Sequence, residues 1–152
     1  MPTSFWARVS AVPAAALMLL GCSSSASNTD EIVSTAEEFG SIRLPDDAEV
    51  LAARADTGGP DSVYRLSVRT SPDGADRIVE GSNLSVGRPE QADFVIYTRD
   101  VLAGPEPVAG PGVQSWQDRT TNAAGDLVTR SITVDTRESP VVYVHLVLAD
   151  VS

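Results

Sequence analysis

Three segments in the last third of the chain alternate apolar and polar residues and are separated by very short turns. They cover residues 113–121, 127–135 and 141–149, and each shows the period of two that is typical of a β-strand. The residues between them, 122–126 and 136–140, are rich in turn-forming Asn, Asp, Gly, Ser and Pro. Because parallel strands need a much longer crossover, such short connections predict an antiparallel meander.

The alternation also predicts which side chains of this meander form the core. The last segment, 141–149, is apolar on both faces, which favours a central or covered strand. In the middle segment, one set of residues is expected to point inward and the other to face solvent. The inward set is Val128, Ile132 and Val134, and the solvent-facing set is Thr129, Ser131 and Thr133.

The first half of the chain adds two strands and two helices to this prediction. Residues 49–55 and 62–70 read as a hairpin around the Gly-rich turn 56–61. Residues 30–39 have helical spacing, and Gly40 is expected to end that helix. Ser71-Pro72-Asp73 has the pattern of a helix start, with Gly81 at the end of that second helix. Residues 94–97 suggest a short buried strand, and 104–112 a stiff Pro/Gly connector.

These elements together predict a small α+β fold. We expect an antiparallel sheet of about five strands, with one or two short helices packed on one face. Trp116 has two interpretations, a core anchor or a partly exposed binding residue, and the core position is favoured because aromatic residues dominate small cores.

The N-terminus has a different composition from the rest of the chain. It carries one basic residue, Arg8, and then an apolar run from Ala11 to Leu20 that Pro13 interrupts. The run is too short to cross a bilayer, which needs about 20 apolar residues. It is typical of the core of an export signal, which has ~7–15 apolar residues. The alternative, a buried helix, is disfavoured by Pro13 and by the lack of a polar face.

Leu19-Leu20-Gly21-Cys22 closes this run, and Cys22 is the only cysteine of the chain. The tetrapeptide resembles the lipobox of bacterial lipoproteins. That resemblance implies transfer of a diacylglyceryl group to the Cys22 thiol, cleavage between Gly21 and Cys22, and N-acylation in organisms that perform it. An ordinary secretory signal with a chance cysteine is the alternative. Each buried methylene of an acyl chain adds ~0.8 kcal/mol, so two or three chains anchor a protein firmly.

The lipobox divides the chain into three parts. Residues 1–21 would be a lipoprotein signal peptide, 22–30 the lipidated cysteine with a flexible Ser-rich tether, and 31–152 a single extracytoplasmic α+β domain. The mature chain that would begin at Cys22 resembles small uncharacterised lipoproteins of actinobacteria. The resemblance is carried by the tether, Leu44-Pro45-Asp46-Asp47-Ala48, the Ser71-Pro72 helix and the 132–135 and 141–144 strands. It implies no activity.

Charge and cysteine content exclude several classes of partner and cofactor. The 152 residues include no lysine, 11 arginines and 21 acidic residues, for a net charge of −10. Nucleic-acid binding depends on basic residues that neutralise phosphates, so we expect no nucleic-acid partner. A single cysteine excludes an internal disulfide and a cysteine-based zinc cluster. The expected partners are the membrane, through the lipid anchor, and an envelope protein or small ligand; no metal or cofactor is expected.

Few residues are candidates for chemistry. His145 is the only histidine, and its place on a strand favours a structural role, hydrogen-bonded at the sheet surface, over that of a general base. Asp56-Thr57-Gly58 matches the aspartic-protease tripeptide, but one copy in a Gly-rich turn favours a plain hairpin. Asp46, Asp47 and Glu49 lack the spacing of a calcium loop and suggest a solvated turn.

Two functions follow from these observations. The favoured one is a membrane-anchored lipoprotein of the cell envelope that acts as a non-catalytic binding or accessory module on the extracytoplasmic face. The alternative is a cell-surface hydrolase that uses His145, which requires a serine and an acid beside that imidazole. The sequence leaves the ligand open, and it also leaves open which membrane carries the protein, the plasma or the outer membrane.

Overall fold

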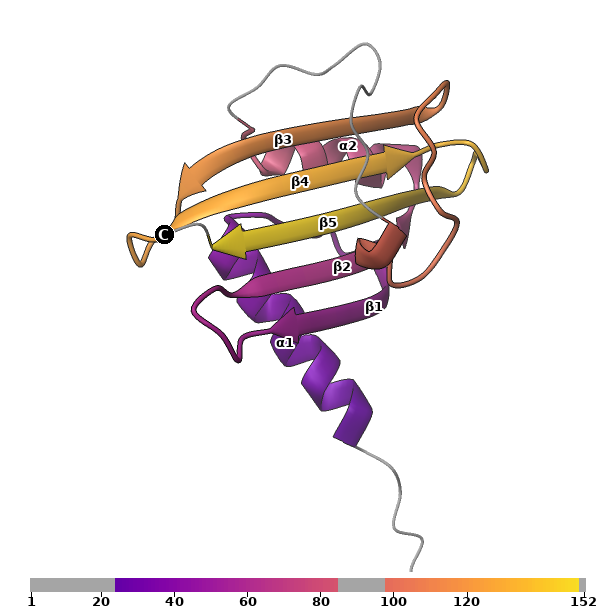
Figure 1. Ribbon diagram of the computed structural model, residues 1–152. Helices are drawn as coiled ribbons and strands as arrows, with labels where there is room; N and C mark the ends of the chain where they lie inside the picture. The colour runs from indigo at the N-terminus through magenta and orange to yellow at the C-terminus, as the bar shows by residue number, and fades with distance from the viewer. Residues whose placement is uncertain (1–23, 85–97, 151–152) are drawn as a thin grey trace, which may run out of the picture.

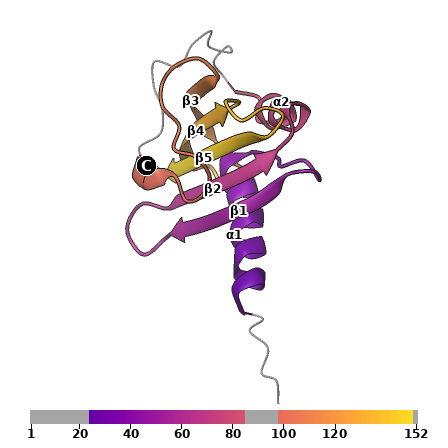
Figure 2. The ribbon, with the colours of Figure 1, turned by 90° about the vertical axis from the view of Figure 1, so that its right-hand side faces the viewer.

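The computed structural model describes residues 24–84 and 98–150, which form one five-stranded antiparallel sheet with both helices on the same face (Figures 1 and 2). The predicted α+β class is confirmed. The predicted strand at 94–97 lies outside the described residues. In chain order the elements are α1 (Ser24–Gly40), β1 (Glu49–Asp56), β2 (Val63–Thr70), α2 (Pro72–Gly81), a short 3₁₀ turn η1 (Thr98–Asp100), β3 (Val113–Thr121), β4 (Leu127–Asp135) and β5 (Val142–Asp150).

The strand order is β1-β2-β5-β4-β3, which joins the N-terminal hairpin to the C-terminal meander through β2 and β5. All neighbours are antiparallel, as the short turns predict. Leu146 at the middle of β5 is opposite Leu66 on one side and Ile132 on the other. This central position explains why β5 is apolar on both faces.

The main core lies between the sheet and the helices. Residues of even number on β2, β4 and β5 point to this face, together with Trp116 of β3, which is 2 % exposed. Trp116 is therefore a core residue, as predicted. The buried apolar residues of this layer include Tyr64, Leu66, Val68, Ile132, Val144, Leu146 and Leu148 from the sheet and Ala36, Ala75 and Ile78 from the helices.

Helix α1 begins earlier than the sequence predicts. Its first turns cover residues 24–30, which the sequence analysis placed in the flexible tether. Helix formation has a costly first turn, but each further residue then adds one hydrogen bond. The packed half of α1, which includes Ala36 and Phe39, supplies that nucleus. In Figure 1 the N-terminal half of the helix projects past the β1 edge of the sheet.

The C-terminal end of α1 lies at Gly40, as predicted, but for a different physical reason. The left-handed residue is Ser41, with φ of 49°, and not the glycine. The amide of Ile42 donates to the Glu37 carbonyl at 3.0 Å, which completes a Schellman-type cap. A Cβ on Gly40 would lie 2.7 Å from a methyl group of Leu148. Gly40 therefore allows close packing on β5, and Ser41 carries the backbone strain.

Replacing Ser41 by glycine is expected to raise the free energy of unfolding by a few tenths up to about 1 kcal/mol, because glycine adopts a positive φ without a Cβ clash. Urea denaturation of the full chain would measure the change. The neighbouring variant Gly40→Ala is the control, and it should lower stability through its clash with Leu148. If Ser41→Gly destabilises as much as Gly40→Ala, the assignment of strain to Ser41 is wrong.

Helix α2 follows the predicted pattern closely. Ser71 is its N-cap, and its Oγ accepts from the Gly74 amide at 3.1 Å. Pro72 occupies the first turn with Asp73, and Ile78 is buried against the sheet.

The face of the sheet opposite the helices is not open to solvent along β4, contrary to the sequence analysis. Thr133 is 0 % exposed and Ser131 is 6 % exposed. The hydroxyl of Thr133 lies 2.7 Å from that of Ser115 on β3, and His145 is its register partner on β5. The prediction was wrong for Ser131 and Thr133. The segment after η1 packs on this same face, against Ser67 of β2 and near His145 of β5, and the alternation within 127–135 carries no signal of a contact so distant in sequence.

Candidate functional site

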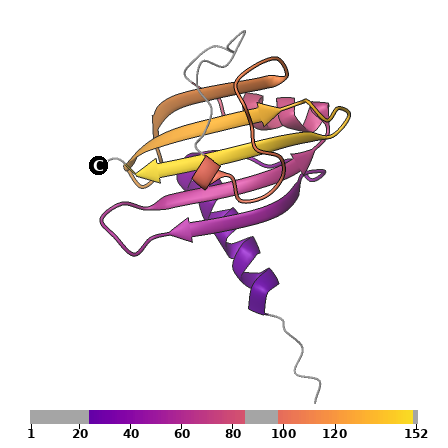
Figure 3. The same ribbon diagram turned by 45° about the vertical axis from the view of Figure 1, so that its right-hand side comes forward.

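Residues 101–107, which we call the strap, lie on the sheet face opposite the helices (Figures 1 and 3). The strap follows η1 and has no regular secondary structure. Its amides at Leu102 and Ala103 both donate to Oγ of Ser67, each at 3.2 Å. Pro107, at its far end, is buried. The strap is therefore fixed by its backbone to the middle of β2.

Ser67 also contacts the only histidine of the chain. Ser67 on β2 and His145 on β5 are directly opposite in register. The Ser67 Oγ lies 3.1 Å from Nδ1 of His145, and both residues are 0 % exposed. The predicted structural histidine is thus an interior residue, whereas the sequence placed it at the sheet surface.

The hydrogen bonds around Ser67 determine the tautomer of His145. A serine hydroxyl has one hydrogen to donate and two lone pairs that accept. The two strap amides occupy both lone pairs, so the hydroxyl hydrogen points to Nδ1. Nδ1 is therefore unprotonated, and the hydrogen of the neutral ring is on Nε2. Among the described residues Nε2 has no hydrogen-bond partner of normal geometry, although the Pro105 backbone is near enough to favour a protonated ring.

Burial lowers the pKa of His145 below the ordinary value of 6.5, against opposing contributions from the Asp135 carboxylate and the Pro105 backbone. Asp135 is itself 1 % exposed. Burial alone would raise the pKa of Asp135, but hydrogen bonds from Arg137 outweigh it and leave the pKa below its ordinary value. These bonds join Nε and the backbone amide of Arg137 to Asp135 at 2.9 and 3.0 Å. The site therefore combines a neutral imidazole with a charged carboxylate.

One ion pair and one backbone contact hold the ends of the strap. Nε of Arg65 lies 2.7 Å from the Asp100 carboxylate just before the strap, and Nη1 of the same arginine lies 2.6 Å from Asp56. Arg137 donates to the Glu106 carbonyl at 2.7 Å.

A left-handed glycine shapes the middle of the strap. Gly104 has φ of 85°, and a Cβ there would lie 2.8 Å from Cδ1 of Tyr143. Only glycine combines this backbone conformation with so close an approach to the sheet.

This arrangement does not form a hydrolytic triad in the state described. A catalytic triad needs an acid on the second ring nitrogen and a nucleophile that a substrate can reach. Here Asp135 is bonded to Arg137, and the Ser67 hydroxyl is 0 % exposed beneath the strap. The donors that would stabilise an oxyanion, the amides of Leu102 and Ala103, are occupied by Ser67 itself. The hydrogen bonds of this cluster therefore hold the strap on the sheet.

The other residues singled out by the sequence lie apart from this cluster. Asp56 ends β1 before the Gly-rich turn and pairs with arginines, in keeping with a plain hairpin. Asp47 forms an ion pair with Arg77. Glu49 forms an ion pair with Arg69, with 2.5 Å between Oε2 and Nη2. Cys22 and Gly21 lie outside the described residues.

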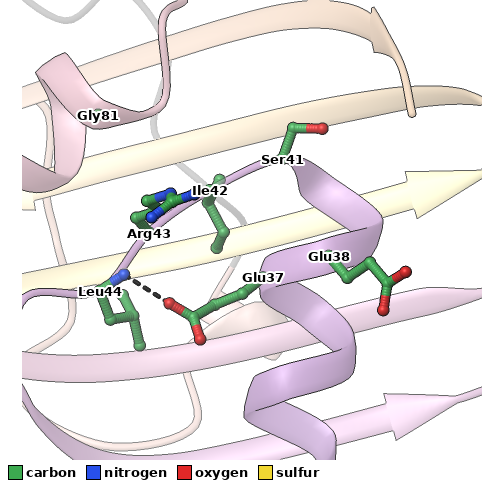
Figure 4. Close-up of a pocket in the computed structure, with 7 residues that line it drawn as sticks. All are labelled: Glu37, Glu38, Ser41, Ile42, Arg43, Leu44 and Gly81. Carbon is green, nitrogen blue, oxygen red and sulfur yellow. Dashed lines mark hydrogen bonds between the residues drawn. The ribbon is translucent and has the colours of Figure 1, made fainter. Parts of the chain in front are cut away.

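An open depression on the helix side is lined mainly by the segment that follows α1 (Figure 4). Its volume is about 510 Å³. Glu37, on one wall, has a structural role, because its Oε1 accepts a hydrogen bond from the Leu44 amide at 2.7 Å. The lining residues are Glu37, Glu38, Ser41, Ile42, Arg43, Leu44 and Gly81.

The contact between Ser67 and His145 was not predicted from the sequence. The sequence placed both residues on strands, Ser67 in the segment 62–70 and His145 in the segment 141–149. The missing information was that β2 and β5 are adjacent, which is a long-range pairing. Given that pairing, the register brings the two residues together.

Comparison with protein-family models, curated proteins and solved structures finds no match. Neither helix within residues 24–84 and 98–150 is long and apolar enough to cross a membrane. The same part of the chain holds no group of three or more His, Cys, Asp or Glu side chains suited to a metal ion.

Proposed function

We propose that the chain is a lipoprotein of the cell envelope, anchored through Cys22, whose folded domain acts as a non-catalytic binding or accessory module on the extracytoplasmic face. The observation that carries this proposal is Leu19-Leu20-Gly21-Cys22 at the end of an apolar run, with no other cysteine in the chain. The partner we expect is an envelope protein or a small ligand. The resemblance to actinobacterial lipoproteins agrees with this assignment but adds no activity.

Two structural features fit such an anchored module. Helix α1 begins two residues after Cys22, so the domain follows the proposed anchor directly. A helix rises about 1.5 Å per residue, so the 17 residues of α1 have the length to hold the sheet away from a bilayer surface. The non-catalytic part of the proposal is supported by the complete burial of the Ser67–His145 contact.

Processing at Cys22 is expected to change the mass of the chain in two ways. In a bacterium with lipoprotein processing, the intact mass should fall by residues 1–21 and rise by a diacylglyceryl group, and the protein should sediment with membranes. Cys22→Ala should keep its leader and lack the lipid, whereas the neighbouring Ser23→Ala should be processed normally. An unprocessed wild-type mass, or a wild-type thiol without lipid, would contradict the anchor.

The accessory role needs a separate experiment, because a lipid anchor is compatible with many activities. The lipidated chain would be cross-linked in intact cells and recovered from envelope extracts, with Cys22→Ala as the control. We expect a defined partner that is retained only by the anchored protein. A hydrolytic activity in the purified chain, without any retained partner, would contradict the non-catalytic proposal.

The alternative, a hydrolase that uses His145, is favoured by one observation: Ser67 donates to the imidazole, as a serine nucleophile would. Its burial argues against it, and a fluorophosphonate probe separates the two. We expect no labelling of the wild-type chain. Labelling that disappears in Ser67→Ala and in His145→Asn would establish the hydrolase instead.

A further inference from the structure

We propose that the strap is a pH-sensitive cover, closed over the sheet while His145 is neutral and released when His145 takes up a proton. The proposal goes beyond the lipoprotein assignment and does not depend on it. It rests on the three hydrogen bonds of the Ser67 hydroxyl, which join the strap to His145, the only histidine of the chain.

The closed state requires an unprotonated Nδ1. The Ser67 hydroxyl donates to Nδ1 and accepts from the amides of Leu102 and Ala103. A proton on Nδ1 converts it from an acceptor to a donor. The Ser67 Oγ would then face three donors with two lone pairs, and its own hydrogen would lose its acceptor. At least one strap amide must leave the serine to accommodate the proton.

A second feature makes the protonated ring costly in the closed state. His145 is 0 % exposed, so a positive charge would be placed in an interior with few compensating groups. Nε2 has no hydrogen-bond partner of normal geometry among the described residues. Release of the strap lets water reach the imidazolium and removes both penalties.

Charged and titratable groups from every neighbouring element influence this equilibrium. Asp135 on β4 favours the protonated ring, but Arg137 in the following turn already neutralises it. Tyr143 shares the outer face of β5, and burial, followed by the Glu138 carboxylate, raises its pKa, so it stays neutral in the acid range. Among the described residues, the other charged groups on this side include Arg65 and Arg69 of β2 and Asp100 of η1. Further along the same face lie Glu49, Arg54 and Asp56 of β1, which are held in ion pairs, and Arg119 of β3, while β3 presents the uncharged Ser115 opposite Thr133. Glu106 belongs to the strap itself.

The direction of the pH effect follows from the linkage of protonation to closure. Burial places the pKa of His145 in the closed state below 6.5, and release returns it toward that ordinary value. The released state therefore binds the proton more readily. The free energy that favours closure has its full value above about pH 6.5. It decreases as the pH falls below 6.5, and the decrease ends once the pH is below the lowered pKa of His145 in the closed state.

The single histidine makes the starting point of this proposal directly measurable. In the full-length chain in detergent, the ¹⁵N shifts of the imidazole at about pH 7.5 should show an unprotonated Nδ1 and a protonated Nε2. The opposite tautomer would overturn the proposal. This readout needs no variant, so it does not depend on how any substitution folds.

The release itself is tested by amide hydrogen exchange at Leu102 and Ala103. After correction for the intrinsic pH dependence of exchange, their protection is expected to fall about tenfold or more between about pH 7.5 and about pH 5. Amides at the centre of β5 should keep their protection. Unchanged protection of the strap while the imidazole titrates would overturn the proposal.

Two variants separate the switch from general acid sensitivity. In His145→Asn the amide oxygen replaces Nδ1 as an acceptor and does not titrate, so strap protection should be independent of pH in this range. In Ser67→Ala the strap amides should exchange faster at both pH values. The same pH dependence in His145→Asn as in the wild type would show that another group controls the strap.

Discussion

Replacing Arg130 by methionine is expected to lower the free energy of unfolding by about 3–5 kcal/mol, because it removes the arginine that neutralises the buried carboxylate of Asp118. Arg130 on β4 is 2 % exposed and points to the helix side of the sheet. Its Nε and Nη2 donate to the two oxygens of Asp118 on β3, at 2.8 and 2.6 Å. The bidentate pair lies among apolar residues, where an uncompensated charge is most expensive.

The same guanidinium also fixes the ends of both helices. Nη1 of Arg130 donates to the carbonyl of Gly40, at the end of α1, at 3.2 Å and to that of Ser82, just after α2, at 2.8 Å. Helix C-termini carry unsatisfied carbonyls and a partial negative charge, and a cation there is stabilising. Methionine fills similar space but satisfies neither carbonyl, so the loss exceeds that of the ion pair alone.

Urea denaturation of Arg130→Met would be compared with that of Arg54→Met, whose arginine is also paired with an aspartate but is 64 % exposed. The exposed pair should change stability by no more than about 0.5–1 kcal/mol. The double variant Arg130→Met/Asp118→Leu should recover part of the loss but not all, because the two helix ends stay uncapped. Equal effects of Arg130→Met and Arg54→Met would show that burial of the pair has no energetic consequence.

This buried pair shows where sequence analysis reaches its limit. The predicted bounds of the five strands agree with the observed ones within one residue. Each strand is marked in the sequence by its own alternation of apolar and polar residues and by the turn residues beside it. Arg130 occupies the inward register between Val128 and Ile132, so its position was readable from the same alternation. The partner of Arg130 could not be predicted from the sequence. The cross-strand pair with Asp118 is buried only because both helices cover that face of the sheet.

The candidate site shows the same limit more strongly. His145 was recognised as the only imidazole, but its burial depends on a segment about forty residues earlier in the chain that carries no periodic signal. A Pro/Gly connector is typical of an exposed loop, whereas here the amides of Leu102 and Ala103 bind it to the middle of the sheet. Backbone donors are the same in every sequence, so such a contact leaves no trace in residue types.

Gly74 in α2 makes a close contact that the sequence does not reveal. Substituting it by alanine is expected to lower the free energy of unfolding by about 3 kcal/mol. A Cβ at this position in α2 would lie 2.0 Å from Oγ1 of Thr70 and 3.2 Å from the Asp47 carboxylate. Helix propensity alone predicts the opposite sign, because alanine is better than glycine by about 1 kcal/mol in a helix. The clash outweighs the propensity since Gly74 and Thr70 are both buried and α2 cannot withdraw without exposing Ile78.

Two further variants identify the clash as the cause, with thermal and urea unfolding as the measurements. Gly81→Ala makes the same change in the same helix, where the nearest atom to the new Cβ is 3.9 Å away, so it should be neutral or stabilising. Thr70→Ala removes Oγ1, which is buried and makes no hydrogen bond among the described residues, and should restore much of the stability of Gly74→Ala. If the double variant is no more stable than Gly74→Ala, close approach to Thr70 is not what requires glycine, and the backbone of α2 itself must be the cause.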